Sequence, residues 1–257
     1  LAVAGITAVI FDMFETLAHN LPGQWEETFR HICQQQRLAV EPARLWQEWR
    51  ALDRQFRQAR TNMDAPEVSP PFKPYSQAWE ESFREAFRRL GLRGDPVAAA
   101  QTCTQSMSQR ELFPDVKPAL AELGRRWRTA LLSNADDAYL LPIVRRYGLA
   151  FEVAISSEQA RAYKPHPAAF RKVLDALGVP AGQCLYVGDN LFDDVLGSKN
   201  AGMVAVWLNR NGAARDPSKP QPDYEICSLS ELPAAVEQAS HSRQSQEQSK
   251  SPPPTAD

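Results

Sequence analysis

The chain has 257 residues, of which 43% are apolar and 23% are charged, an ordinary composition for a globular protein. This length allows one large core, or one core with an accessory domain. The net charge of −2 and the isoelectric point near 6.2 give no basic excess, so nucleic acid is not an expected partner. No run of about 18 apolar residues occurs, so a membrane-spanning helix is not expected.

The first eleven residues are apolar, and a signal peptide is the alternative to exclude. The stretch has no basic start, and Asp12 and Glu15 interrupt it before a full apolar region and a cleavage site can form. We therefore expect residues 7–11 to form a short buried strand. Cysteines and histidines are too few and too widely spaced for a zinc site or a disulfide framework, which fits a reducing cytoplasm.

The segment that follows, residues 19–111, is predicted to be helical. Apolar and aromatic residues recur at helical spacing, and a proline-dense loop is expected at 66–74. The predicted helices cover residues 26–36, 42–60, 75–90 and 96–110. We interpret their aromatic side chains mainly as packing between helices. These are Trp46, Trp49, Phe56, Trp79, Phe83 and Phe87.

Short apolar runs then alternate with helical patterns from about residue 112 to 232. The predicted strands are 129–133, 153–155, 184–187 and 204–208, and the predicted helices are 117–126, 137–147, 167–177 and 192–200. Nearly continuous apolar strands alternating with helices indicate a parallel sheet covered on both faces. The predicted fold class is therefore α/β, with a Rossmann-like core formed by residues 1–18 and 112–238 and an inserted α-helical domain at 19–111. Residues 239–257 are rich in Ser, Gln and Pro and are predicted to be a disordered tail.

Polar residues follow the ends of the predicted strands. Asp12 follows the first strand, and Ser133 and Asn134 end the second. Lys164 lies in the loop after the third, and Asp189 follows the fourth, with Asp193 and Asp194 close behind. Ligands of open parallel sheets bind where these ends converge. Each residue alone has an ordinary structural explanation, such as a helix cap or a turn, but the set in this order is far more specific.

Four segments carrying these residues resemble the motifs of the haloacid dehalogenase-like hydrolase superfamily. They are residues 9–17, 131–134, 163–165 and 187–202, and the last is especially specific. The length between the first two motifs is similar to the α-helical (C1-type) cap of the superfamily's first subfamily. The resemblance implies a hydrolase with a sheet core and a cap that opens and closes over the site.

The resemblance also implies roles for individual residues. Asp12 would be the covalent nucleophile, with Ser133 and Lys164 as its catalytic partners. Asn134 and Thr16 would bind substrate. Mg²⁺ would be held by Asp12, the backbone carbonyl of Phe14 and Asp189, with Asp194 as a possible outer ligand and Asp193 as its weaker competitor. A few carboxylates plus substrate oxygens suit Mg²⁺, and the cations would offset repulsion between nucleophile and phosphate.

Phe14 departs from the superfamily's phosphatases, which usually have a proton-transferring Asp at that position. The loss is not trivial, because general acid–base catalysis is typically worth roughly 10²–10⁴-fold. The superfamily's metal-free 2-haloacid dehalogenases have an aromatic residue there, since halide leaves without a proton. The acidic cluster at 189–194 favours a metal site instead, because unbalanced carboxylates repel one another. The halide-binding run of those dehalogenases is also missing after Trp49 and Arg50.

Three functions therefore stay open. A Mg²⁺-dependent phosphatase acting on a small phosphorylated metabolite is favoured over a metal-free dehalogenase and over a catalytically weak ligand-binding protein. Glu15 and His19 are candidates to replace the missing acid, although Glu15 is expected to point away from Phe14 along an extended backbone. Cap residues available for specificity, none of which the sequence favours, are Trp25, Arg30, Trp46, Arg50 and Arg54.

Overall fold

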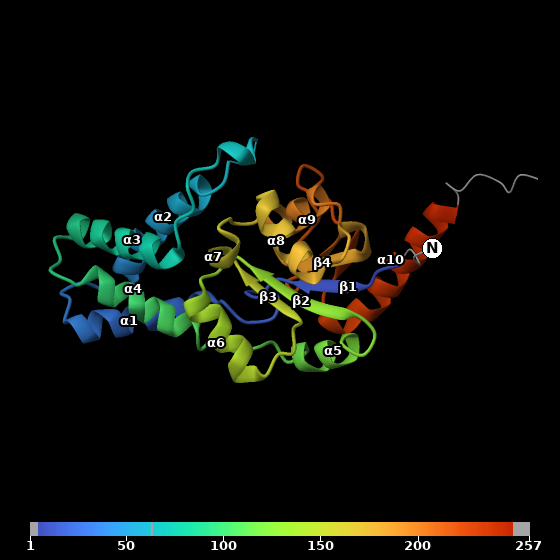
Figure 1. The fold of residues 1–257 in the computed structure, drawn as a ribbon. Helices are drawn as coiled ribbons and strands as arrows, with labels where there is room; N and C mark the ends of the chain where they lie inside the picture. Colours follow the sequence, from blue (N-terminus) through green and yellow to red (C-terminus); the bar gives the residue numbers. More distant parts are fainter. Residues whose placement is uncertain (1–4, 63, 249–257) are drawn as a thin grey trace, which may run out of the picture.

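The computed structural model describes residues 5–62 and 64–248 and has a parallel β-sheet at its centre (Figure 1). The six strands lie in the order β3-β2-β1-β4-β5-β6, and every neighbouring pair is parallel. The fold is α/β and Rossmann-like, as predicted. The strands are β1 (Ala8–Phe11), β2 (Arg128–Ser133), β3 (Val153–Ser156), β4 (Cys184–Gly188), β5 (Val204–Leu208) and β6 (Tyr224–Ile226).

Helices cover both faces of the sheet, and the alternation of side chains along β1 shows why. Val9 and Phe11 pack into one cluster with α5 (Val116–Leu123), α6 (Asp137–Tyr147) and α10 (Leu232–Gln248). Ala8 and Ile10 face the other way, onto α8 (Pro167–Leu177). Apolar residues on both faces explain the uninterrupted hydrophobic runs of the central strands. The remaining short helices are α7 (Ser157–Ala160), α9 (Gly197–Asn200), η2 (Ala181–Gln183) and η4 (Leu229–Glu231).

The helical insertion lies between β1 and α5, at one end of the molecule (Figure 1). Three of the predicted packing residues, Trp49, Trp79 and Phe83, are buried between its helices. The Trp49 ring centroid lies 6.1 Å from that of Trp79 and 5.6 Å from that of Phe83, so the predicted packing role of these rings is confirmed. The predicted loop contains only a short 3₁₀ turn, η1 (Pro66–Val68). The insertion comprises α1 (Pro22–Gln36), α2 (Pro42–Ala59), α3 (Tyr75–Leu90) and α4 (Pro96–Met107).

The insertion is docked firmly on the sheet domain. The Trp79 ring stacks on Tyr139 of α6, with centroids 5.6 Å apart and an interplanar angle of 18°. Asp136, which precedes α6, is buried and accepts hydrogen bonds from the backbone N–H groups of Tyr75 (2.9 Å) and Ser76 (2.7 Å). A carboxylate of the sheet domain therefore satisfies two of the free amides at the start of α3.

The C-terminal region corrects one prediction. Helix α10 extends through Gln248, so residues 239–248 are helical rather than part of a disordered tail. Ala239 is 1% exposed, and the Ser240 hydroxyl accepts a hydrogen bond from the Ile6 backbone N–H (3.1 Å), so this polar helix is anchored to the core. The remaining tail residues, 249–257, lie outside the described part of the chain. Within that part, no helix has the length and apolarity needed to cross a membrane.

Candidate active site

The nucleophile candidate Asp12 lies at the centre of the sheet edge. It follows β1, which pairs with β2 on one side and β4 on the other, so Ser133 and Asp189 flank it. Its backbone N–H donates to the Val187 carbonyl (3.0 Å), continuing the pairing with β4. The strand order reverses between β1 and β4, the point at which open α/β sheets form their ligand crevice. The predicted convergence of strand ends is therefore observed.

Asp12 is held by two donors. Its Oδ1 atom accepts hydrogen bonds from the Ser133 hydroxyl (2.9 Å) and the Lys164 ammonium (2.7 Å). The side chain is 7% exposed, and burial raises its pKa to about 6, with Lys164 lowering it and Asp194 raising it. The carboxylate is thus oriented, and a pKa of about 6 leaves it mainly ionised at neutral pH, as its predicted role requires.

Lys164 joins the nucleophile to the fourth motif. Its ammonium also contacts Asp194 Oδ1 (2.6 Å) and the Tyr186 hydroxyl (2.7 Å), and the residue is 2% exposed. Burial lowers the pKa of Lys164, but the charges of Asp12 and Asp194 outweigh burial and hold that pKa well above its ordinary value. Lys164 therefore remains a cation between two carboxylates.

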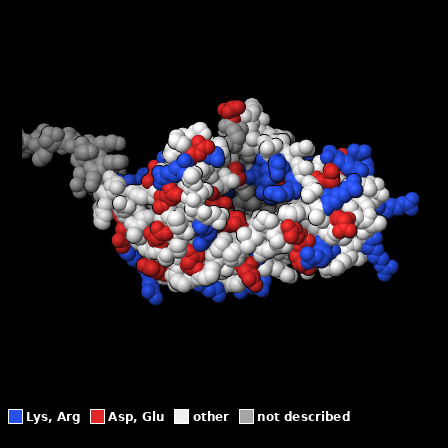
Figure 2. All heavy atoms as spheres, turned by 180° about the vertical axis from the view of Figure 1, so that it is seen from behind, with Lys and Arg blue, Asp and Glu red and all other residues white. Residues whose placement is uncertain are grey.

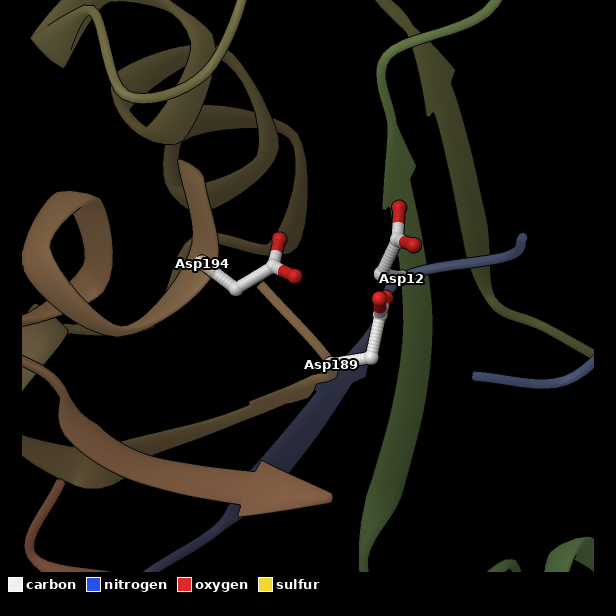
Figure 3. A group of neighbouring side chains, drawn as sticks. All are labelled: Asp12, Asp189 and Asp194. Carbon is white, nitrogen blue, oxygen red and sulfur yellow. The ribbon is translucent and has the colours of Figure 1, made fainter. Parts of the chain in front are cut away.

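Three carboxylates meet beside this lysine. Asp12, Asp189 and Asp194 each offer an oxygen within 4.8 Å of the others, and Figure 3 shows them around a common space. Burial, then the charges of Asp194 and Asp12, raises the pKa of Asp189 well above its ordinary value. This donor set fits Mg²⁺, which favours a few carboxylate oxygens and would relieve the repulsion among them.

A π-helical turn, η3 (Leu191–Leu196), brings Asp194 back to the strand ends. The Asn190 side chain accepts hydrogen bonds from the backbone N–H groups of Phe192 and Asp193, and the backbone N–H of Asn190 donates to Asp194 Oδ2 (2.9 Å). Gly188 leaves the necessary space, because a Cβ at that position would lie 2.3 Å from Asp194 Oδ2. The Gly-Asp pair at 188–189 is therefore a steric requirement of the carboxylate cluster and not merely a turn.

The remaining predicted site residues, Asn134, Thr16 and Phe14, lie around the carboxylate cluster and the pocket, each with different neighbours. Asn134 lines the pocket, and its side chain exchanges hydrogen bonds with the Lys164 backbone, donating to the carbonyl (3.1 Å) and accepting from the N–H (2.7 Å). Thr16 is fully buried behind Asp189 and donates to its Oδ1 (3.3 Å). The Phe14 ring lines the pocket, 5.7 Å from the Tyr139 ring. Substrate contact by Thr16 and metal binding by the Phe14 carbonyl stay predictions.

The pocket above Asp12 is closed by the insertion. It has a volume of about 160 Å³ and is lined from both domains. Figure 2 shows basic side chains gathered at the rim of a hollow on the side of the inserted helices. Sequence reasoning missed the insertion's contributors, because the aromatic ones look like core residues and the arginines like a solvated helix face. These contributors are Asn20, Arg57, Arg60, Tyr75, Trp79 and Met107.

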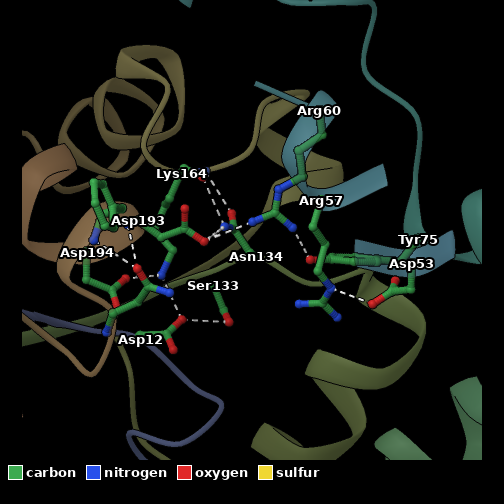
Figure 4. Close-up of polar contacts among 12 residues, drawn as sticks. Asp12, Asp53, Arg57, Arg60, Tyr75, Ser133, Asn134, Lys164, Asp193 and Asp194 are labelled. Carbon is green, nitrogen blue, oxygen red and sulfur yellow. Dashed lines mark hydrogen bonds and ion pairs between the residues drawn. The ribbon is translucent and has the colours of Figure 1, made fainter. Parts of the chain in front are cut away.

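Arg60 links the insertion to the fourth motif (Figure 4). Its guanidinium forms an ion pair with Asp193 (2.9 Å), and Asp193 also accepts from the Asn134 side chain (3.1 Å). The neighbouring acids therefore have separate surroundings, since Asp194 belongs to the carboxylate cluster and Asp193 to the contact between domains. This arrangement supports Asp194 over Asp193 as the candidate metal-site residue.

The candidates for a replacement acid are also separated. Glu15 lines the pocket, and its backbone is left-handed (φ 63°), so the extended backbone on which the expectation for its side chain depended is not observed. His19 packs on Phe113 with ring centroids 3.8 Å apart and lines an adjacent cavity of about 270 Å³. Specificity candidates predicted elsewhere in the insertion do not line the pocket. These are Trp25, Arg30, Trp46, Arg50 and Arg54.

A haloacid dehalogenase-like hydrolase family model matches residues 6–202, and the chain belongs to that family. N-acylneuraminate-9-phosphatase of Rattus norvegicus is 32% identical over 182 residues, covering 65% of this chain and 72% of the relative. Haloacetate dehalogenase H-2 of Moraxella sp. is 36% identical over 131 residues, covering 50% and 58%. The structure of the HAD-hydrolase YfnB from Bacillus subtilis, bound to magnesium, has a TM-score of 0.71 at 20% identity, covering 90% and 99%.

Proposed function

We propose that this hydrolase is a Mg²⁺-dependent phosphatase that acts on a small phosphorylated metabolite through an aspartyl-phosphate at Asp12. The observation that carries the proposal is the cluster of Asp12, Asp189 and Asp194, whose mutual repulsion calls for a cation. The similarity to a phosphatase over 72% of that relative's length supports it. Four free cysteines fit a reducing, cytoplasmic setting.

The proposed reaction has two displacements. A carboxylate oxygen of Asp12 attacks phosphorus, and the bond from phosphorus to the alcohol oxygen breaks. The Ser133 hydroxyl and Lys164 ammonium, both within hydrogen-bond distance of Asp12, bind the phosphoryl oxygens gathered there. The alcohol leaves as an alkoxide. Water then attacks the phosphorus and the bond from phosphorus to the Asp12 oxygen breaks, which releases inorganic phosphate and restores the Asp12 carboxylate. The proton that water loses is taken up by the alkoxide.

The metal site has a limited role in this proposal. Mg²⁺ held by Asp12, Asp189 and Asp194, with the Phe14 carbonyl as a further ligand, would neutralise charge on the phosphoryl group. Thr16 orients Asp189 through its hydrogen bond, and Asn190 orients Asp194. The protein's own contribution is to hold these oxygens at fixed positions around the pocket.

Hydrolysis of p-nitrophenyl phosphate, measured with added Mg²⁺ and with excess chelator, tests the proposal. We expect turnover that requires the metal, and the acidic phenol makes the missing acid unimportant in this assay. The proposal would be refuted if excess chelator left the hydrolysis rate unchanged, or if no hydrolysis occurred at any Mg²⁺ concentration.

Phe14 supports a second candidate, a metal-independent 2-haloacid dehalogenase. In that reaction a carboxylate oxygen of Asp12 attacks carbon and halide leaves, so no acid is needed. Water then hydrolyses the ester on Asp12, which releases the hydroxy acid and a proton and restores the carboxylate. The likeness to haloacetate dehalogenase H-2 favours it, although this chain covers only 58% of that relative. Chloride release from 2-chloropropionate in the presence of chelator identifies this activity, and its absence excludes it for that substrate.

The variant Phe14→Asp separates the two candidates further. If the chain is a phosphatase that lacks its acid, the new carboxyl should raise turnover of alkyl phosphates by about 10- to 100-fold, within the typical range of acid catalysis. Phe14→Leu is the matched control, because it also removes the ring contact with Tyr139 but adds no acid. Equal effects of both variants would show that proton donation is not what the site lacks.

A further inference from the structure

Arg57, in the last turn of α2, and Arg60, directly after that helix, line the pocket beside Asp12, and their hydrogen bonds differ. Arg60 donates to the Tyr75 hydroxyl and to Asp193, and its side chain is 6% exposed. Its terminal nitrogens are therefore used by the protein itself. Arg57 is 42% exposed, and its ion pair with Asp53 uses Nε (2.6 Å).

Figure 4 shows the other two nitrogens of the Arg57 guanidinium with no contact drawn to them, and Arg57 lines the same pocket as Ser133. The guanidinium carbon lies 5.0 Å from the Tyr75 ring centroid, so the aromatic ring supports the cation. Two adjacent N–H groups on one planar fork match the two oxygens of a carboxylate.

The position of the Arg57 guanidinium is fixed by hydrogen bonds that run through Asp53 to Trp79. Asp53 is 7% exposed, and its Oδ1 accepts from the Trp79 indole N–H (3.1 Å) while Oδ2 accepts from Arg57. Trp79 is itself packed against Tyr139 of the sheet domain. A fork held in this way loses less side-chain freedom on binding a ligand than a free surface arginine.

We propose that Arg57 is a specificity-determining residue, which binds a carboxylate on the alcohol part of a small phosphate monoester. The inference rests on the proposed function, because it places the phosphoryl group at Asp12 and the second anion at the opposite wall. The pocket volume of about 160 Å³ is below the roughly 300–1,000 Å³ typical of drug-sized ligands, so the favoured substrate is a short phosphorylated hydroxy acid.

Calorimetry on the full-length Asp12→Asn protein with Mg²⁺ tests the proposal without turnover. The probes are phosphoglycolate and ethyl phosphate, which differ in having a carboxylate or a methyl group at the same position. We expect phosphoglycolate to bind more tightly, and Arg57→Ala to reduce the ratio of the two affinities by about 10- to 100-fold, as loss of charge-assisted hydrogen bonds predicts. Arg57→Lys keeps the positive charge but lacks the two adjacent N–H groups, so its ratio of affinities should lie between those of the starting protein and Arg57→Ala.

Arg54→Ala is the matched control, an exposed arginine of the same helix outside the pocket, and it should leave the ratio unchanged. Equal weakening of both probes by Arg57→Ala, or no preference for phosphoglycolate in the starting protein, overturns the inference. Absence of p-nitrophenyl phosphate turnover in the wild type would instead refute the phosphatase function, and a ratio that still falls in Arg57→Ala would leave Arg57 as a carboxylate-binding residue.

Discussion

The two walls of the pocket are built in different ways. The sheet wall brings together Asp12, Ser133 and Asp189 because adjacent parallel strands end at the same edge. The insertion wall brings Arg57 and Tyr75 there only because helices pack on one another and on α6. One wall follows from strand order, and the other from tertiary packing.

This difference separates chemistry from recognition. The sheet wall carries the candidate nucleophile, its lysine and the carboxylate cluster, and Lys164 joins Asp12 to Asp194 by hydrogen bonds of 2.6–2.7 Å. The insertion wall carries cations and aromatic rings suited to the rest of a substrate. Changes in the sheet wall should therefore affect turnover and the charge balance of the core, and changes in the insertion wall should affect selectivity and docking.

The largest expected effect is that of Asp12→Asn. The amide keeps the shape of the side chain but cannot attack phosphorus or carbon, so turnover should fall by at least about 10³-fold on any substrate the enzyme accepts. Steady-state kinetics measures the loss, and circular dichroism checks that the fold is intact. Substantial remaining turnover would contradict nucleophilic catalysis by Asp12.

Lys164→Met should affect stability most strongly. The substitution leaves Asp12 and Asp194 buried without the cation that joins them, which typically costs about 3–5 kcal/mol. The loss should be larger at pH 8 than at pH 5, because the carboxyl groups can take up protons in acid. Urea unfolding at both pH values measures it, with the exposed Lys172→Met as control. A loss independent of pH would show that packing, not charge, is responsible.

Magnesium should stabilise the protein more at pH 8 than at pH 5. The pKa of Asp12 is raised to about 6 and that of Asp189 well above its ordinary value, so the folded state holds protons that the unfolded chain releases at lower pH. The stability that these protonated groups contribute is therefore lost as the pH rises through their pKa values in the folded protein. The metal binds the ionised carboxylates, so it should stabilise the protein more at the higher pH. The expected gain is about 2.7 kcal/mol at one hundred times Kd.

Thermal melting with and without MgCl₂ measures this gain. Asp189→Asn should remove it, and should make the metal-free protein more stable at pH 8 by relieving repulsion. Asp175→Asn, at an exposed position of α8, should keep the gain unchanged. A similar gain in Asp189→Asn would place the metal elsewhere.

The smallest expected effect is that of Arg60→Ala in the insertion wall. Asp193 keeps its bond from Asn134 and part of its exposure to water, so the loss of the ion pair should cost about 1–2 kcal/mol. We expect faster proteolysis at residues 62–74 and a modest rise in KM, with kcat affected less. Arg54→Ala is the control, and an equal change in that variant would mean that Arg60 does not tie the insertion to the sheet domain.

The sheet wall could be predicted because its signals are local in sequence. Apolar runs marked β1, β2 and β4, and the residues directly after them gave the candidate site. Strand β6 was missed, since Tyr-Glu-Ile at 224–226 is too short to form an apolar run. Helix α10 was not predicted, because its second half is polar and its Ser240 contacts Ile6, which lies far away in the chain.

The insertion wall could not be predicted, because helical periodicity shows which residues are buried but not which of them border a cavity. Arg57 and Arg54 are both exposed arginines of α2, yet only Arg57 lines the pocket. Glu15 itself has a left-handed backbone, a conformation that reasoning from an extended strand does not anticipate. Such features depend on how two domains meet.

The hydrogen bonds from α3 to Asp136 have a consequence for the independence of the insertion. Pro74, the residue before α3, has no side chain that can accept a hydrogen bond from the first amides of the helix. Asp136 of the sheet domain accepts these hydrogen bonds instead. Asp136 is only three positions after Ser133, on the same connection between β2 and α6. The insertion is therefore not a portable module. Grafted onto another scaffold, it would need a new acceptor for these two amides.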